Sequence, residues 1–128
     1  MARVIVADDD GLVRWSLSQT LSREGYEVIT AESPAQILAE IVRATVDVVV
    51  TDYLFPESDG VEVLRKIKTS MPKTHVIMIT SYGSPRLERL VRDIGAFDYF
   101  DKPFEVKAVA GSVARALVTP ERRRGPRA

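Results

Sequence analysis

The chain contains no cysteine, which excludes disulfide bonds, thiolate nucleophiles, iron–sulfur clusters and cysteine zinc sites. It also has no excess charge of one sign, because 18 Lys and Arg residues balance 18 Asp and Glu residues. The overall charge therefore draws it neither to nucleic acid nor to an anionic membrane. No apolar run approaches the roughly 18 residues of a membrane span, and the first residues lack the apolar stretch of a signal peptide. We predict a soluble, cytoplasmic protein with no direct nucleic-acid or membrane binding.

The composition is that of an ordinary globular domain. Hydrophobic residues make up 45% of the 128 residues and charged residues 28%, which suffices for a core and excludes a low-complexity chain. The length is that of one domain rather than of a multidomain enzyme. We place this domain at residues 1–118. Residues 119–128 contain four arginines and one glutamate, and we interpret them as a flexible basic tail or the start of a linker.

Short Val- and Ile-rich runs alternate with longer amphipathic stretches along the chain. This alternation is typical of a parallel sheet with crossover helices. The runs expected to form strands are 3–8, 26–31, 46–51, 75–80 and 97–100. The expected helices are 12–24, one that starts at 34 and includes Val42, 61 to before 72, 84–94 and 104–118. The prediction is an α/β, flavodoxin-like, doubly wound sheet of five parallel strands in the order 2-1-3-4-5.

Cap residues and apolar stripes support these helices. Ser33 before Pro34 is an N-cap followed by proline at the first helical position, and Gly25 and Gly95 are expected to close two other helices. The side chains expected to face the core are Val13, Leu17 and Leu21 on the first helix and Ile37, Leu38, Ile41 and Val42 on the second. The third strand is almost uninterruptedly apolar, which suits a strand covered on both faces.

Polar side chains follow the strands at the points where the strands end. Asp8 and Asp9 end the first strand, Asp52 and Thr80 end the third and fourth, and Lys102 lies just beyond the fifth. Because ligands of such sheets bind outside the carboxyl ends of the strands, we expect these five residues to form one site. Three carboxylates would repel one another unless a cation lay among them. Oxygen ligands favour Mg²⁺.

The remaining two residues indicate a phosphoryl group as the ligand. Lys102 adds a compact positive charge and Thr80 a hydroxyl donor, and with a metal ion they describe a pocket for a dianion. A carboxylate in such a pocket can act as a nucleophile and form an aspartyl-phosphate. Positioning and charge neutralisation during in-line transfer would then supply most of the catalysis.

The motifs together closely resemble the receiver domain of two-component response regulators, from residue 3 to about 118. They are Asp8-Asp9 after an apolar strand, Asp52 before Leu54-Phe55-Pro56 and Asp59-Gly60, Thr80-Ser81, and Lys102-Pro103-Phe104. Their order and spacing are specific although no single motif is. The stretches around Asp8 and Tyr99 look most like receivers of enhancer-binding AAA+ transcriptional activators.

The resemblance implies a role for each site residue. Asp52 would be the phosphoacceptor, and Asp9, Asp52 and the backbone carbonyl of Leu54 would bind Mg²⁺, with Asp8 assisting through metal-bound water. The catalytic group would comprise Asp52, Thr80 and Lys102, because Thr80 would hydrogen-bond the phosphoryl oxygen and Lys102 would pair with it. The switch would comprise Thr80 and Tyr99, which turns inward.

The resemblance also implies a cis Lys102–Pro103 peptide and a set of partners. A sensor histidine kinase would supply the phosphoryl group, which would change the surface of the fourth helix, fifth strand and fifth helix. A homodimer through that surface is expected, as is control of transcription by a C-terminal output domain outside this chain. The chain is accordingly either an excised receiver or a stand-alone regulator, and it catalyses only its own phosphorylation and dephosphorylation.

Three single residues and one arginine run outside the motifs carry separate expectations. We expect Asp10 to cap the first helix, and His75, the only histidine, to be solvated and without catalytic duty. Trp15 is expected to be partly exposed, either as a kinase contact or as simple surface coverage. The run from Arg122 to Arg124 is expected to be a solvated tail.

Two other functions compete with the receiver interpretation. A haloacid dehalogenase-type phosphatase also uses a nucleophilic aspartate, Mg²⁺, a Thr or Ser and a lysine, and Asp8 and Asp10 imitate its opening motif. That class needs a further acidic pair after the lysine, where this chain has only Glu105 and Glu121. A pseudo-receiver used only for docking is disfavoured because no site residue is missing.

Overall fold

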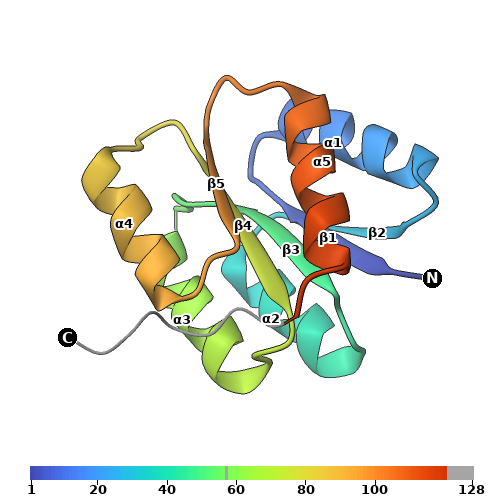
Figure 1. The fold of residues 1–128 in the computed structure, drawn as a ribbon, viewed down its shortest axis with the longest axis horizontal. Helices are drawn as coiled ribbons and strands as arrows, with labels where there is room; N and C mark the ends of the chain where they lie inside the picture. Colours follow the sequence, from blue (N-terminus) through green and yellow to red (C-terminus); the bar gives the residue numbers. More distant parts are fainter. Residues whose placement is uncertain (57, 121–128) are drawn as a thin grey trace.

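The fold is described from a computed structural model, which covers residues 1–56 and 58–120. Strands and helices alternate along the whole domain (Figure 1). In chain order they are β1 (Arg3–Ala7), α1 (Gly11–Arg23), β2 (Glu27–Ala31), α2 (Pro34–Arg43), β3 (Val48–Asp52), α3 (Gly60–Ser70), β4 (His75–Thr80), α4 (Pro85–Ile94), β5 (Asp98–Asp101) and α5 (Val106–Leu117). No described helix is long and apolar enough to cross a membrane.

The five strands form one parallel sheet in the order β2-β1-β3-β4-β5, which confirms the predicted topology. The largest difference in strand bounds is the start of β3, which was expected at Val46 and lies at Val48. The carboxylate of Asp47 accepts a hydrogen bond from the backbone N–H of Arg3 at 2.8 Å. A side chain, rather than a backbone carbonyl of the neighbouring strand, therefore accepts that bond. The tail predicted at residues 119–128 lies outside the described residues after Pro120, the arginine run included.

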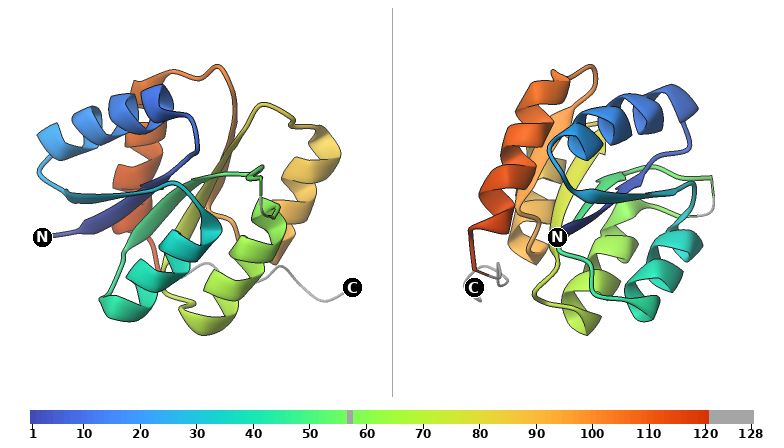
Figure 2. Two further views of the ribbon diagram at one scale, coloured as in Figure 1. Left: turned by 180° about the vertical axis from the view of Figure 1, so that it is seen from behind. Right: turned by 90° about the vertical axis from the view of Figure 1, so that its right-hand side faces the viewer.

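Two apolar layers enclose the sheet. The side chains of α2, α3 and α4 pack on one face, and those of α1 and α5 pack on the other (Figure 2). All five residues of β3 are buried, which confirms that this strand is covered on both faces. The inward placement of Val42 was wrong, because this residue is 80% exposed. It lies in the last turn of α2, where Ile41 takes the core position.

The helix ends follow the cap chemistry of the sequence. The Asp10 carboxylate accepts hydrogen bonds from the N–H groups of Leu12 and Val13, so Asp10 caps α1 as predicted. Ser33 caps α2 in the predicted way. Gly95 has φ 128°, a conformation that side chains rarely adopt, and it ends α4 as expected.

His75 is buried rather than solvated, so that prediction was wrong. Its side chain is only 3% exposed, its ring lies 5.0 Å from the ring of Phe97, and its Nε2 lies 2.9 Å from the Thr119 carbonyl oxygen. Thr119 follows α5 and therefore closes over the start of β4. No local pattern around His75 predicts this cover, because it comes from residues distant in the sequence.

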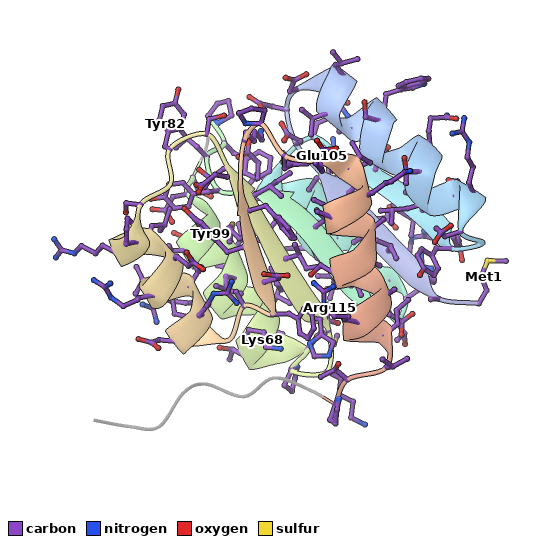
Figure 3. The ribbon with its side chains drawn as sticks, turned by 45° about the horizontal axis from the view of Figure 1, so that its top comes forward. Met1, Lys68, Tyr82, Tyr99, Glu105 and Arg115 are labelled. Carbon is purple, nitrogen blue, oxygen red and sulfur yellow. The ribbon has the colours of Figure 1, made fainter. Side chains whose placement is uncertain are left out.

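Asp98 joins three neighbouring elements. One oxygen of its carboxylate accepts hydrogen bonds from Arg92 of α4 at 3.1 Å and from the Tyr99 N–H at 2.8 Å. The other accepts from Ser112 at 2.6 Å and Arg115 at 3.4 Å, both on α5 (Figure 3). Burial alone would raise the pKa of Asp98, but the hydrogen bonds from Ser112, Tyr99 and Arg92 outweigh it and lower the pKa. Asp98 therefore holds α4 and α5 to β5 in its ionised form.

We expect Asp98→Asn to lower the free energy of unfolding by about 1–3 kcal/mol at pH 7, the usual range for hydrogen bonds to a charged group. A lowered folded pKa means that the carboxylate stabilises the fold above the ordinary aspartate pKa. That contribution is lost as the pH falls through the folded value. Urea unfolding of wild type and variant between pH 7 and pH 2 measures the difference, which should shrink on acidification. Asp93→Asn, which removes an exposed carboxylate of α4, is the control.

Candidate functional site

The predicted site residues meet at the carboxyl edge of the sheet. Asp8 and Lys102 directly follow β1 and β5, while Asp52 and Thr80 are the last residues of β3 and β4. The register places Asp52 beside Ile79, one residue before Thr80, so these ends are level. One carboxylate oxygen from each of Asp8, Asp9 and Asp52 lies within 4.8 Å of the others. The structure therefore brings the acidic group and the lysine together at one point.

Lys102 lies between two of the carboxylates. Its Nζ is 2.7 Å from Asp8 Oδ2 and 3.2 Å from Asp52 Oδ2. The Lys102 N–H also donates to the Thr80 carbonyl at 2.7 Å, and the Lys102–Pro103 peptide is cis, as predicted. The backbone N–H of Lys102 is thus held to the end of β4.

Asp52 and Lys102 shift each other's pKa. Burial, followed by the neighbouring charge of Asp8, raises the pKa of Asp52, although Lys102 acts in the opposite direction. Burial would lower the pKa of Lys102, but its hydrogen bond to Asp8 and the charge of Asp52 outweigh burial and raise it. The lysine is therefore firmly protonated, whereas the surroundings of Asp52 disfavour its charged form.

The carboxylates of Asp8, Asp9 and Asp52 differ in how many hydrogen bonds their oxygens already accept. Asp8 is fully buried, and its two carboxylate oxygens accept from the Asp10 N–H at 2.8 Å and from Lys102. Asp9 is exposed, and within the described residues the Asp52 carboxylate accepts, besides the bond from Lys102, a long 3.4 Å bond from the Leu54 N–H. Asp9 and Asp52 can thus bind an ion directly more readily than Asp8 can.

The loop after Asp52 is held close to β3. The Gly60 N–H donates to the Tyr53 carbonyl, and a Cβ on Gly60 would lie 2.9 Å from Tyr53 Cα, so a side chain there would force the loop apart. Leu54 forms an isolated bridge with Asp59 within this loop. These contacts keep the Leu54 backbone beside the acidic group.

The donor set fits a hard divalent cation. Every candidate ligand is an oxygen, from the carboxylates of Asp9 and Asp52 or the carbonyl of Leu54, and Mg²⁺ prefers oxygen ligands and retains several waters. A cation would also relieve the repulsion that raises the pKa of Asp52. The residues present therefore fit the predicted Mg²⁺.

Thr80 and Tyr99 lie on either side of the loop between β4 and α4. The Thr80 hydroxyl is buried and accepts from the Tyr82 N–H at 2.9 Å. Tyr99 of β5 is 7% exposed and its side chain extends toward α4, whereas Tyr82 points outward from the loop (Figure 3). The Tyr99 hydroxyl accepts from the Ser84 N–H and donates to Asp101, each at 3.1 Å. Burial and the Asp101 carboxylate raise the pKa of Tyr99.

Two features of the site were not predicted. A Cβ on Gly83 would collide with the Tyr99 hydroxyl and the Asp101 carboxylate, so this glycine allows the loop to close over the tyrosine. Arg14 of α1 donates from Nη1 to the Asp8 carbonyl at 2.6 Å. No sequence signal indicates that Gly83 lies against Tyr99, because 16 positions separate them. Arg14 lies one turn from the acidic run, and that spacing was an available signal.

Comparison with known proteins decides the family. The model of the response regulator receiver domain matches residues 4–114, which is most of the chain. The chain belongs to this family. It is therefore a receiver domain of a response regulator, which is consistent with a signalling protein, and the phosphatase alternative is not favoured.

This receiver domain is similar to proteins with different overall architectures. It is 34% identical over 122 residues to the DNA-binding transcriptional regulator NtrC of Rhizobium meliloti strain 1021, which covers 95% of this chain and 25% of that protein. It is 28% identical over 115 residues to sporulation initiation phosphotransferase F of Bacillus subtilis strain 168, which covers 90% of this chain and 93% of that protein. The receiver thus spans about a quarter of the NtrC relative and nearly all of the sporulation protein.

A solved structure has the same fold. The beryllofluoride-activated receiver domain dimer of NtrC4 superimposes with a TM-score of 0.87 at 33% identity, covering 91% of this chain and 97% of that chain. The strand order of this receiver domain is therefore that of its family.

Proposed function

We propose that this receiver domain accepts a phosphoryl group from a sensor histidine kinase on Asp52 and thereby changes the surface formed by α4, β5 and α5. The observation that carries the proposal is the placement of Asp52 within 3.2 Å of Lys102 and within the three-carboxylate cluster at the sheet edge. This arrangement combines a nucleophile, a metal-binding group and a fixed cation. The domain would act in the cytoplasm.

The transfer step follows from the residues at the edge. A carboxylate oxygen of Asp52 attacks phosphorus, an O–P bond forms, and the P–N bond to the donor imidazole breaks with its electron pair remaining on nitrogen. Asp9, Asp52 and the Leu54 carbonyl would hold Mg²⁺, with Asp8 acting through water. When bound, this ion neutralises charge on the phosphoryl oxygens. Lys102 would pair with one of these oxygens in place of its bond to Asp52.

The switch would act through the loop between β4 and α4. Thr80 would turn its hydroxyl from the Tyr82 N–H to the phosphoryl group, and the loop would move with it. Tyr99 would follow because its hydroxyl is bonded to the Ser84 N–H at the start of α4. The added charge of about −1.5 to −2 thus biases the position of α4 relative to β5.

An acyl-phosphate assay tests this proposal. The full chain is incubated with acetyl phosphate and Mg²⁺, and bound phosphate is counted against released phosphate. A receiver should retain about one acid-labile phosphoryl group per chain, whereas a haloacid dehalogenase-type phosphatase should release many per chain. A chain that takes up no phosphate would be a docking-only receiver, and the proposal would then be wrong.

The phosphorylated form is expected to hydrolyse slowly, with a half-life of many minutes or longer. Leu54 and Tyr82 lie two residues beyond Asp52 and Thr80 and are 45% and 70% exposed, and neither is a carboxamide or an acid able to orient an attacking water. Leu54→Asn supplies such a group and should shorten the half-life by up to about 100-fold, the lower end of what general acid–base assistance contributes. Loss of label after removal of the donor measures both rates. A wild-type half-life of seconds would contradict the expectation.

The kinase would contact the edge of the domain beside the site. Trp15 is 61% exposed on α1, which confirms its predicted exposure, and Leu12 is 72% exposed one turn earlier. A groove of about 220 Å³ adjoins them, lined by Leu12, Val13, Ser16, Pro103, Phe104 and Val106. This apolar surface borders Lys102 through Pro103, so a kinase helix lying there would present its phosphohistidine to Asp52.

The output would be transcriptional and would involve a second copy. The NtrC relatives are DNA-binding transcriptional regulators about four times as long as the matched segment, and the NtrC4 receiver domain forms a dimer. We propose that α4, β5 and α5 form the dimer surface here, as part of a longer activator.

A further inference from the structure

Arg14 makes a contact at the site that no role assigned above requires. Its Nη1 donates to the Asp8 carbonyl oxygen at 2.6 Å, and the side chain is partly buried. The guanidinium group bends back over the first turn of its own helix, with Nη2 3.5 Å from the place where a Cβ on Gly11 would lie. A long and entropically costly side chain is therefore held in one conformation against the loop between β1 and α1.

The contact completes the fixing of Asp8. The Asp8 N–H donates to the Ala31 carbonyl at 3.2 Å, and its carboxylate is held by Asp10 and Lys102. With Arg14 on the carbonyl, every hydrogen-bonding group of Asp8 has a partner. The carbonyl is the one group of Asp8 that belongs to the planar peptide linking it to Asp9.

Asp9 depends on that peptide for its direction. Within residues 1–56 and 58–120, no hydrogen bond or ion pair holds the exposed Asp9 carboxylate. The backbone therefore sets the direction of the Asp9 Cα–Cβ bond, from which the carboxylate reaches the ion, and Arg14 holds the backbone on the N-terminal side of Asp9. A group bonded to the support of a metal ligand typically affects metal affinity although it does not touch the metal.

The charge of Arg14 alone would have the opposite effect. A cation near the three carboxylates repels Mg²⁺, and the N-terminus of α1 is itself the positive end of a helix dipole. Removal of the charge should then tighten Mg²⁺ binding. Loss of the bond to the Asp8 carbonyl should weaken it, so the two roles predict changes of opposite sign.

We propose that Arg14 is a positioning residue that orients Asp9 toward Mg²⁺ by fixing the Asp8–Asp9 peptide. The proposal rests on the proposed function only in taking Mg²⁺ as the ion that Asp9 binds. It assigns Arg14 no contact with the phosphoryl group. Arg14 would exert this effect in the unphosphorylated protein, before any phosphoryl donor binds.

Isothermal titration of the full chain with MgCl₂ tests the proposal without phosphorylation. Arg14→Met removes the donor and keeps the apolar stem, and we expect it to raise the Kd for Mg²⁺ about tenfold, at the low end for such supporting groups. Arg14→Gln retains an N–H donor without the charge and should give a smaller increase. Arg23→Met removes a cation from the last turn of the same helix and should leave the Kd within about twofold of wild type.

A Kd that is unchanged or lower in both Arg14 variants would overturn the proposal. Thermal unfolding in EDTA shows whether each variant folds, and Arg14→Gln serves if Arg14→Met does not. A wild-type chain that binds no Mg²⁺ would instead defeat the proposed function. A chain that binds Mg²⁺ but takes up no phosphate would leave the role of Arg14 standing.

Discussion

Asp52→Asn is expected to abolish phosphoryl uptake from acetyl phosphate, with a rate at least about 100-fold below that of the wild type, because a neutral amide is not a carboxylate nucleophile. The loss should occur without loss of the fold. Burial and Asp8 raise the pKa of Asp52, so at pH 7 its ionised form opposes folding. The Asp52 carboxylate therefore destabilises the fold as the pH rises above the ordinary aspartate pKa toward the raised pKa of Asp52 in the folded protein. The amide should therefore unfold at an equal or higher temperature in EDTA.

Mass spectrometry of the intact chain measures the uptake, and thermal unfolding measures the stability. Asp59→Asn is a matched control, because it removes a carboxylate from the same edge while asparagine can still cap α3. It should retain a phosphorylation rate within about threefold of wild type. Acid-labile phosphate appearing on Asp52→Asn at the wild-type rate would exclude Asp52 as the acceptor.

Lys102→Met should reduce the phosphorylation rate about 100-fold and make the fold strongly dependent on Mg²⁺. The lysine touches both Asp8 and Asp52, and breaking a buried pair by removing one partner costs about 3–5 kcal/mol. The remaining carboxylates would repel one another until a cation binds among them. Because a ligand that binds only the folded state stabilises it, Mg²⁺ should restore much of this loss.

This dependence is measured by comparing unfolding midpoints in EDTA and in about 10 mM Mg²⁺, a concentration chosen to saturate the site. The gain on adding Mg²⁺ should be larger in Lys102→Met than in wild type. Lys107→Met, which removes an exposed cation of α5, should behave as wild type. An equal gain in Lys102→Met and wild type would show that the lysine does not stand between these carboxylates in solution.

Much of the fold could be predicted because the relevant signals are local. The bounds of β4 agree with the sequence pattern at both ends, and Ser33 and Asp10 cap the helices that they were expected to cap. The convergence of Asp8, Asp52 and Lys102 follows from the strand order alone, because parallel strands place their carboxyl ends together. A correct topology therefore yields the main site residues without knowledge of any side-chain contact.

Two predictions were wrong and one contact was missed, each for a different reason. His75 was placed at a solvated loop edge, but Thr119 covers it from 44 positions away. Val42 fits an apolar stripe by its type, yet the last turn of α2 leaves it exposed. The bond from Arg14 to Asp8 requires the side chain to fold back toward the start of its helix. Periodicity identifies which face a residue occupies, but not which remote segment covers that face.

The burial of His75 beneath Thr119 fixes where the residue after α5 lies relative to Asp52. Asp52 ends its strand at one edge of the sheet, whereas Thr119 lies against the first residue of β4, at the other edge. A six-residue strand is about 16 Å long, so Thr119 is separated from Asp52 by roughly the full depth of the sheet. If Asp52 is the acceptor, as proposed, a segment that follows Thr119 begins at the opposite edge of the sheet from it and would sense the modification through the body of the domain.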